Sequence, residues 1–262
     1  MSKYFIDCEF IEGTQTPSFF LKGRLGNWIG AYKKPTIDLI SIGIVSEDNR
    51  EYYAISKDFN LDEAWNRFDI KEVNGDQRNH YPNGVKVYWI RDNVLFPIWV
   101  ELWCEDKNLD FKMVNTYKTG TAKDYSNFNY KVLKQLINKY GKTNKQIAEE
   151  IKEFVNGIGE DISVGYGDKE FYGYYADYDW VVFCWLFGKM IDLPKGFPMY
   201  CIDLKQELDN KVDIIRKPTD LTIEQMLETI KGVANYPKQT NEHNALDDAK
   251  WNFELYKFIQ TL

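Results

Sequence analysis

The chain has 262 residues, of which 44% are hydrophobic and 16% aromatic, and its formal net charge is −7. This apolar content supports a substantial core, which excludes a disordered chain, and the negative charge argues against a protein that coats duplex nucleic acid by charge alone. No apolar run approaches the roughly eighteen residues of a membrane span, and the N-terminal MSKYFIDCEF does not have the pattern of a signal peptide, so we expect a cytoplasmic protein without membrane contact.

The first predicted element is a strand from Lys3 to Phe10 that carries two acids, Asp7 and Glu9. Side chains two positions apart on a strand point to the same face, so these two carboxylates lie together while the apolar residues between them face the other way. Carboxylates this close repel each other and stay ionised at low cost only where cations lie between them. The sequence therefore predicts metal ligands, with a solvated edge strand as the alternative.

Two further strands, from Ile37 to Val45 and from Glu51 to Ser56, are predicted on either side of the polar turn SEDNR. The preceding segment from Glu12 to Thr36 has four cations against one acid, and its part FFLKGRLGNWIGAYKK, residues 19–34, interleaves them with aromatic rings. We expect residues 19–34 to form a flap over a phosphate-bearing strand, with a structural hairpin or a dimer contact as alternatives.

From about Lys57 to Asn129 the pattern is mixed, with a possible strand in GVKVYWI, and it predicts no single topology. Helical periodicity returns after Thr143, where TNKQ offers a capping box for a helix that Gly157 would end. A strand from Glu170 to Ala176 follows, and then an apolar helix that begins near Asp179 and stops at Gly188. The last helix is predicted from about Asn244 to Ile259.

This order of elements predicts an α/β fold, a mixed β-sheet flanked by α-helices. We expect residues 1–262 to form a single domain with insertions at about 12–36 and 57–129. The four cysteines are widely spaced among apolar neighbours, which is typical of packed, reduced thiols and not of a disulfide or zinc framework.

Polar residues near the ends of the last two helices are further candidates for a site. On a helical wheel Asp248 falls on the apolar side of the last helix, where a charge needs a partner, whereas Asp247 falls in the solvated stripe. His243 could accept a proton at neutral pH, and a helix cap or an exposed imidazole is its alternative. Asp179 and Asp177 compete as the N-cap of the apolar helix, and the residues alone do not separate them.

These residues form a D-x-E pair on the first strand, an Asp at a strand-to-helix junction and the pattern H-x-A-x-x-D in the last helix. The set resembles the DEDDh 3′-to-5′ exonucleases of the ribonuclease T and oligoribonuclease superfamily, which have a ribonuclease H-like fold. The runs FIDCEF, IDLISIGIVSEDNREYYAIS and YYADYDWVVFCWLFG are similar to the branch typified by exoribonuclease AS. In that branch the metal-binding Asp directly follows a Tyr and opens the helix, which favours Asp179 over Asp177.

The resemblance implies that two divalent cations, Mg²⁺ or Mn²⁺, are held by four carboxylates, those of Asp7, Glu9, Asp179 and Asp248. It also implies that His243 is the general base and that the enzyme hydrolyses single-stranded RNA from its 3′ end to 5′-mononucleotides, with a homodimer as a possible assembly. Phe10 and Trp180, each next to one of these acids, are candidates for stacking on a base, with core packing as the alternative. A single-strand DNA exonuclease and a catalytically idle nucleic-acid-binding module are the alternative functions.

Overall fold

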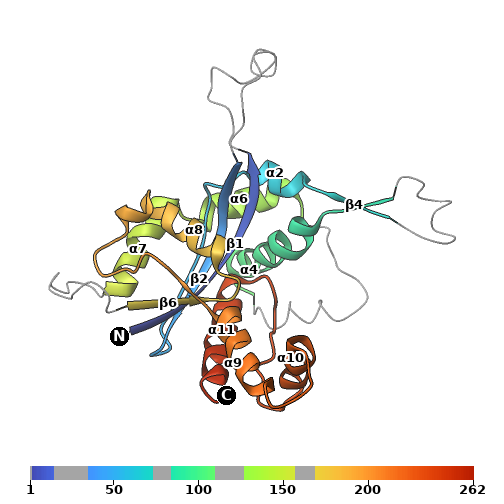
Figure 1. The fold of residues 1–262 in the computed structure, drawn as a ribbon. Coiled ribbons are helices and arrows are strands. Elements are labelled where there is room, and N and C mark those ends of the chain that lie inside the picture. Colours follow the sequence, from blue (N-terminus) through green and yellow to red (C-terminus); the bar gives the residue numbers. More distant parts are fainter. Residues whose placement is uncertain (1, 15–34, 73–83, 110–126, 157–168) are drawn as a thin grey trace, which may run out of the picture.

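The computed structural model of this chain describes residues 2–14, 35–72, 84–109, 127–156 and 169–262. Its centre is a five-stranded sheet in the order β3-β2-β1-β6-β7 (Figure 1). The strands are β1 (Ser2–Thr14), β2 (Pro35–Ser46), β3 (Glu51–Ile55), β6 (Lys169–Gly173) and β7 (Ile202–Asp203). The first three pair in antiparallel fashion, whereas β6 runs parallel to β1 and β7 parallel to β6, which confirms the predicted mixed sheet.

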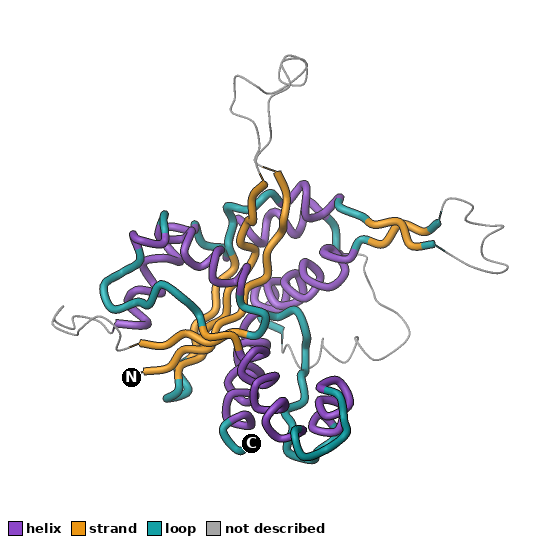
Figure 2. The backbone as a smooth tube through the Cα atoms, viewed as in Figure 1, coloured by secondary structure: helices purple, strands orange, loops and turns teal. Residues whose placement is uncertain are grey.

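Helices cover both faces of this sheet (Figure 2). One face packs against α7 (Asn144–Asn156) and α8 (Asp177–Phe187), which is followed by the 3₁₀ turn η5 (Met190–Asp192). The other face packs at one end against α9 (Leu204–Arg216), α10 (Ile223–Lys231) and α11 (Ala245–Ile259). At its other end lie α2 (Leu61–Asn66), the π-helical segment η2 (Arg91–Leu95), α4 (Phe96–Lys107) and α6 (Tyr130–Tyr140). In the described parts of the chain, no helix combines the length and the apolar character needed to span a bilayer.

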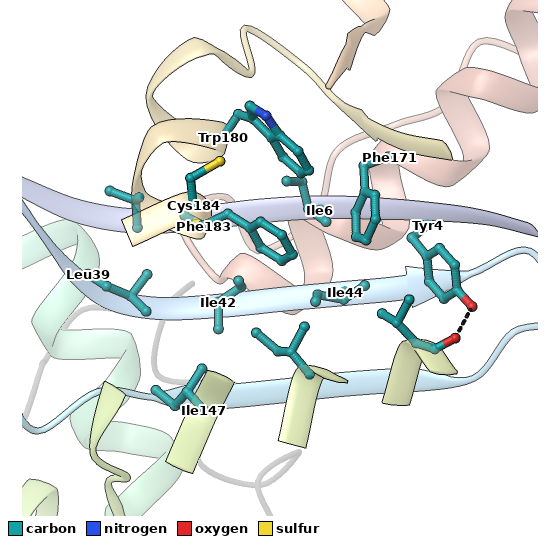
Figure 3. Close-up of a cluster of buried hydrophobic side chains, with 14 of the residues drawn as sticks. Tyr4, Ile6, Leu39, Ile42, Ile44, Ile147, Phe171, Trp180, Phe183 and Cys184 are labelled. Carbon is teal, nitrogen blue, oxygen red and sulfur yellow. Dashed lines mark hydrogen bonds between the residues drawn. The ribbon is translucent and has the colours of Figure 1, made fainter. Parts of the chain in front are cut away.

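The core beneath α7 and α8 is continuous and aromatic (Figure 3). Tyr4 and Ile6 of β1 point into it, and Phe171 of β6 and Phe183 of α8 are both fully buried there. The hydroxyl of Tyr4 donates a 2.9 Å hydrogen bond to the carbonyl of Val155, the last buried residue of α7. This face therefore joins the sheet to its two helices through a continuous apolar core.

Several boundaries differ from those expected from the sequence. Strand β1 continues to Thr14 and β2 begins at Pro35, so the ends of the predicted 12–36 insertion belong to the sheet. Strand β6 ends at Gly173, because the chain turns at Tyr175, whose φ of 54° lies in the left-handed region.

The predicted capping box is confirmed, since the Thr143 and Gln146 side chains each accept from the other's backbone N–H. Residues 19–34, expected to form a flap, and Gly157 lie outside the described residues.

The mixed region after β3 contains a small two-stranded ribbon. It consists of β4 (Asp69–Lys71) and β5 (Val85–Val87), which pair in antiparallel fashion. The strand that GVKVYWI suggested is therefore only three residues long, and Trp89 beyond it already belongs to a helical turn. In Figure 1 the ribbon extends away from the body of the molecule, next to the helices that begin with η2.

Candidate active site

The two acids of β1 lie where the two apolar clusters of one sheet face meet. On this face the strand carries Phe5, Asp7, Glu9 and Ile11 in succession. Phe5 belongs to the cluster under α11, and Ile11 belongs to the cluster under α4 and α6. Asp7 is half-buried and Glu9 is only 9% exposed. The structure thus places both carboxylates on one face, as the strand spacing predicted, in a gap between two hydrophobic cores.

Asp179 reaches this gap from the first turn of α8. Because β6 ends at Gly173 while β1 continues, the backbone N–H of Cys8 is free to donate to Asp179 Oδ1, at 2.7 Å. Asp179 is 8% exposed, whereas Asp177 is exposed. Burial raises the pKa of Asp179 to about 7, the negative charge of Glu9 adds to this, and the hydrogen bond from Cys8 opposes it.

Neither acid is the N-cap of α8. The helix begins at Asp177, its N-cap is Ala176, and no side chain bonds the first turn at that position. The prediction that the helix starts near Asp179 was late by two residues, because the chain enters the helix directly from the sharp turn at Tyr175. Capping therefore does not account for the burial of Asp179, and the contact with Cys8 does.

Asp248 lies in the first turn of α11 and is 6% exposed, as its place on the apolar side of the helical wheel predicted. Its Oδ2 accepts from the backbone N–H of His243 at 2.8 Å, and its Oδ1 accepts from Gln239 Nε2 at 2.6 Å. Burial raises the pKa of Asp248 to about 6. Asp247 instead bonds to Asn241 Nδ2 at 2.6 Å and lies 3.9 Å from the ammonium of Lys250, on the polar side of the helix.

Two contacts fix the first turns of α11 against the sheet. Gly43 of β2 stands opposite Asp7 of β1, and a Cβ at this glycine would lie 2.2 Å from the carbonyl oxygen of Ala245. One turn beyond Asp248, the side chain of Asn252 donates a 2.9 Å hydrogen bond to the carbonyl of Ile6. The missing side chain of Gly43 and the bond from Asn252 together let the helix approach closely enough to bring Asp248 next to the acids of β1.

His243 stands at the open side of this cluster. Its φ of 67° lies in the left-handed region, and its side chain is 36% exposed. Its Nδ1 lies 3.7 Å from Glu9 Oε1, and this carboxylate raises the pKa of the imidazole. Asn244, whose side chain accepts from the N–H groups of Leu246 and Asp247, is the N-cap of α11, so His243 is not a helix cap.

Residues 28–260 match the family described as "3'-5' exoribonuclease Rv2179c-like domain". The chain belongs to this family. It is 25% identical over 260 residues to the 3'-5' exoribonuclease Rv2179c of Mycobacterium tuberculosis strain H37Rv, an alignment that covers 98% of this chain and 92% of that protein. The same values hold for the 3'-5' exoribonuclease MT2234.1 of Mycobacterium tuberculosis strain CDC 1551.

Membership of the Rv2179c-like family suggests a divalent metal, and the side chains of this site fit one. Glu9, His243 and Asp248 each offer a ligand atom, and these atoms all lie within 4.8 Å of one another. Burial raises the pKa of Asp7 well above its usual value, and the charges of Asp179, Glu9 and Asp248 raise it further. Within the described ranges, no Lys or Arg forms an ion pair with any of the four carboxylates, so the site lacks a counter-ion of its own.

The two aromatic residues predicted to stack on a base have different surroundings. Trp180 is 8% exposed, and its ring stacks on Phe183 at 4.8 Å and packs against Phe171 at 5.3 Å. Trp180 therefore has the surroundings of the core-packing alternative, next to Phe171 and Phe183 (Figure 3). Phe10 is half-buried, with its ring edge-on to Tyr178 at 5.9 Å.

Sequence reasoning missed Trp89 and Gln239, both of which lie at this Rv2179c-like site. The ring of Trp89 meets the imidazole of His243 edge-on, with centroids 4.8 Å apart, and is 44% exposed. Gln239 holds one oxygen of Asp248. In the sequence Trp89 is only a large aromatic residue in an irregular insertion, and this pattern does not indicate which residues the ring contacts.

Proposed function

We propose that the protein is a metal-dependent 3′-to-5′ exoribonuclease of the DEDDh type with a ribonuclease H-like fold. It would hydrolyse single-stranded RNA from the 3′ end and release 5′-mononucleotides. The observation that carries this proposal is the convergence of Glu9, His243 and Asp248, whose ligand atoms lie within 4.8 Å of one another. The family match and the names of the two mycobacterial relatives support the same activity.

The carboxylates of the site would hold two divalent cations, and hard oxygen ligands favour Mg²⁺ or Mn²⁺. The four ligand residues are Asp7, Glu9, Asp179 and Asp248. When bound, such cations lower the pKa of water and neutralise negative charge on a leaving 3′ oxygen. The hydrogen bonds that Asp179 accepts from Cys8 and that Asp248 accepts from Gln239 would hold these two carboxylates in fixed orientations.

His243 would act as the general base that takes a proton from the attacking water. Its side chain is partly exposed, so the imidazole is accessible from the side on which a substrate enters. Glu9 raises its pKa and thereby increases its affinity for a proton, although the base must be neutral before the reaction starts. The left-handed backbone of His243 and the bond from its N–H to Asp248 would keep the ring at the rim of the site.

The terminal nucleotide would lie against Trp89. This ring is 44% exposed beside the imidazole of His243, and a base could stack on its free surface without any sequence readout. Phe10, half-buried on β1 next to Glu9, is a second candidate for contact with the nucleotide. The enzyme would act in the cytoplasm, where RNA is available and thiols such as those of the four cysteines, which form no disulfide, stay reduced.

A homodimer is proposed as the assembly, because α8 exposes an apolar stripe. Tyr178, Val181 and Trp185 follow one another at helical spacing and are 51%, 37% and 48% exposed. A second copy of the chain would cover this stripe. In sedimentation experiments Trp185→Glu should shift the protein to the monomer, whereas Ile214→Glu, at an exposed apolar residue of α9, should not. A wild-type monomer at micromolar concentration would contradict the dimer.

The activity is tested by incubating the protein with 5′-labelled single-stranded RNA and DNA of equal sequence, with Mg²⁺, with Mn²⁺ or with EDTA. We expect a ladder that shortens from the 3′ end on RNA, is lost in EDTA and is lost in Asp7→Ala. Preference for DNA would replace the exoribonuclease by a single-strand DNA exonuclease with the same site. Cleavage that persists in EDTA would contradict the metal-dependent mechanism.

Neighbouring acids provide matched controls for this assay. Asp179→Asn and Asp248→Asn each alter a proposed ligand, whereas Asp177→Asn and Asp247→Asn alter a more exposed acid in the same helical turn. We expect Asp179→Asn and Asp248→Asn to abolish the ladder, and Asp177→Asn and Asp247→Asn to retain it. Equal activities of the two variants in α8, or of the two variants in α11, would refute the assignment of the ligand in that helix.

A further inference from the structure

The β4–β5 ribbon begins next to the proposed active site. Its second strand, β5, ends at Val87, and two residues later Trp89 contacts the imidazole of His243. The residue between them, Tyr88, packs against Phe68, which directly precedes the other strand, with ring centroids 5.8 Å apart. The ring at the site, Trp89, is therefore the chain neighbour of a pair of rings at the base of the ribbon.

One face of the ribbon combines two of these rings with the cation of Lys86. In the register of the pair, Ile70 stands opposite Lys86 and Asp69 stands opposite Val87, and Phe68 and Tyr88 follow directly on the side of the body of the molecule. Residues that alternate along a strand share a face, which places Phe68, Ile70, Lys86 and Tyr88 on the same side. The opposite side carries Asp69, Lys71, Val85 and Val87.

Two cations lie directly over rings of this face. The ammonium of Lys86 is 3.9 Å from the centre of the Phe68 ring. The guanidinium of Arg91, which belongs to η2 and also pairs with Asp92 at 3.2 Å, is 3.8 Å from the centre of the Tyr88 ring. Phe68 and Ile70 are 40% and 56% exposed, although burial of such side chains is the usual outcome. The four positions of this face include no acid, in a protein whose net charge is −7.

We infer that this ribbon is an RNA-binding arm, which holds nucleotides upstream of the 3′-terminal one; the inference rests on the proposed exoribonuclease function. A positively charged surface with exposed rings is how proteins bind single strands without reading their sequence, because every base has a face that can stack and every nucleotide has a phosphate. Trp89, which contacts His243, directly follows Tyr88 in the chain, so a strand whose 3′ end lies at His243 would pass over Tyr88 and Phe68. A short substrate would not reach them.

The dependence of activity on RNA length tests the arm. The substrates are 5′-labelled RNAs of two, four, eight and twelve nucleotides with the same 3′ sequence, and the quantity measured is kcat/KM with Mg²⁺. We expect Phe68→Ala and Lys86→Ala each to lower kcat/KM about tenfold on the two longest RNAs, since loss of one stacked ring or of one phosphate contact weakens single-strand binding by about this order. On the dinucleotide each variant should stay within about twofold of the wild type.

The ribbon itself supplies the matched control. Lys71→Ala removes an exposed lysine from the opposite face, so it should behave as the wild type at every length. Activity on the dinucleotide reports the proposed function separately from the arm. Two results would overturn the inference if the wild type is active. One is an equal effect of Lys86→Ala and Lys71→Ala on kcat/KM, and the other is a loss of kcat/KM that is the same for all RNA lengths. So would a Phe68→Ala variant that changes only the sedimentation coefficient, because the face would then bind a second copy of the chain.

Discussion

The two faces of β1 share one backbone, but one is apolar and packed in a core whereas the other carries acids that need neutralising. On one face Ile6 and Cys8 are at most 5% exposed and pack with the helices above them into an aromatic core (Figure 3). On the other face Asp7 and Glu9 interrupt the apolar residues and have no Lys or Arg partner among the described residues. The first face stabilises the fold by itself, whereas the second becomes favourable only when protons or cations neutralise it.

This contrast shows how a strand can be stable and reactive at once. Side chains alternate between the two faces of a strand, so neighbouring residues of β1 have different roles. One is buried in the core, and the next belongs to the acidic face. Helix α11 is held to the acidic face by Asn252, and α7 is held to the apolar face by Tyr4, each through a buried hydrogen bond of 2.9 Å. Substitutions on the two faces should therefore separate effects on activity from effects on stability.

The largest effect is expected on the acidic face from Asp7→Asn. This change removes a charge from the cluster while preserving its shape, and it should lower kcat/KM on single-stranded RNA at least about 1,000-fold, because several kcal/mol of charge stabilisation by metal are lost. In EDTA the same variant should melt at a higher temperature than the wild type, since one buried carboxylate with a raised pKa is gone. Activity near the wild-type level would show that this face is not the reactive one.

A smaller effect on function is expected from Asn252→Leu. The bond from this side chain to the carbonyl of Ile6 keeps α11, and with it Asp248, next to β1. Loss of such a supporting contact should weaken Mn²⁺ binding, measured by titration calorimetry, about tenfold. Removal of one buried hydrogen bond should also lower the free energy of unfolding by about 1 kcal/mol.

Tyr4→Phe is the matched variant on the other face. It removes a buried hydrogen bond of the same length, from Tyr4 to Val155, and should lower the free energy of unfolding by about 1 kcal/mol as well. Its affinity for Mn²⁺ should not change. If both variants lose the metal equally, or neither does, the two faces are not functionally distinct.

The acidic face should also make stability depend on pH. The pKa values of Asp179 and Asp248 are raised by burial to about 7 and about 6, so the folded protein binds protons that the unfolded chain has released. The stability that this provides is complete below about pH 4 and is lost as the pH rises through 6 and 7. In EDTA we therefore expect the melting temperature to fall between pH 5 and pH 8, as measured by differential scanning fluorimetry.

Saturating Mg²⁺ should remove most of this decline, because bound cations replace the protons and stabilise the folded state. A residual decline should remain from Glu101 of α4, whose pKa burial raises to about 7. A melting temperature in EDTA that rises over this pH range would contradict the sign of the effect. The same decline with and without Mg²⁺ would show that the cations do not bind at these acids.

The smallest effect is expected from Ile6→Val on the apolar face. Ile6 is fully buried, and loss of one methylene group there should lower the free energy of unfolding by about 1 kcal/mol in a urea titration. Both kcat/KM and Mn²⁺ affinity should stay at the wild-type level, because the side chain of Ile6 lies on the face of the strand opposite to Asp7 and Glu9. A lower kcat/KM measured under conditions in which the variant stays folded would contradict the separation of the two faces.

Much of the fold could be predicted from local pattern. Alternation along β1 put Asp7 and Glu9 on one face, the helical wheel put Asp248 on the buried side of α11, and Thr143 with Gln146 marked a helix start. Each of these depends on residues a few positions apart, whose geometry the backbone period sets directly. The acid of α8 was harder, because Asp177 and Asp179 look alike until the turn at Tyr175 orients the helix.

The remaining features depend on contacts between distant segments. Trp180 looks like a stacking residue in the sequence, but Phe171 and Phe183 enclose it once β6 and α8 pack together. Trp89 lies in an irregular insertion, and only the folded chain brings it to His243. The sequence by itself determined the mixed sheet, the shared face of the first two acids and the family of the chain. Only the tertiary structure decided which carboxylates meet, which rings stay exposed and where the insertion lies, because these follow from the packing of whole elements and not from the period of any one of them.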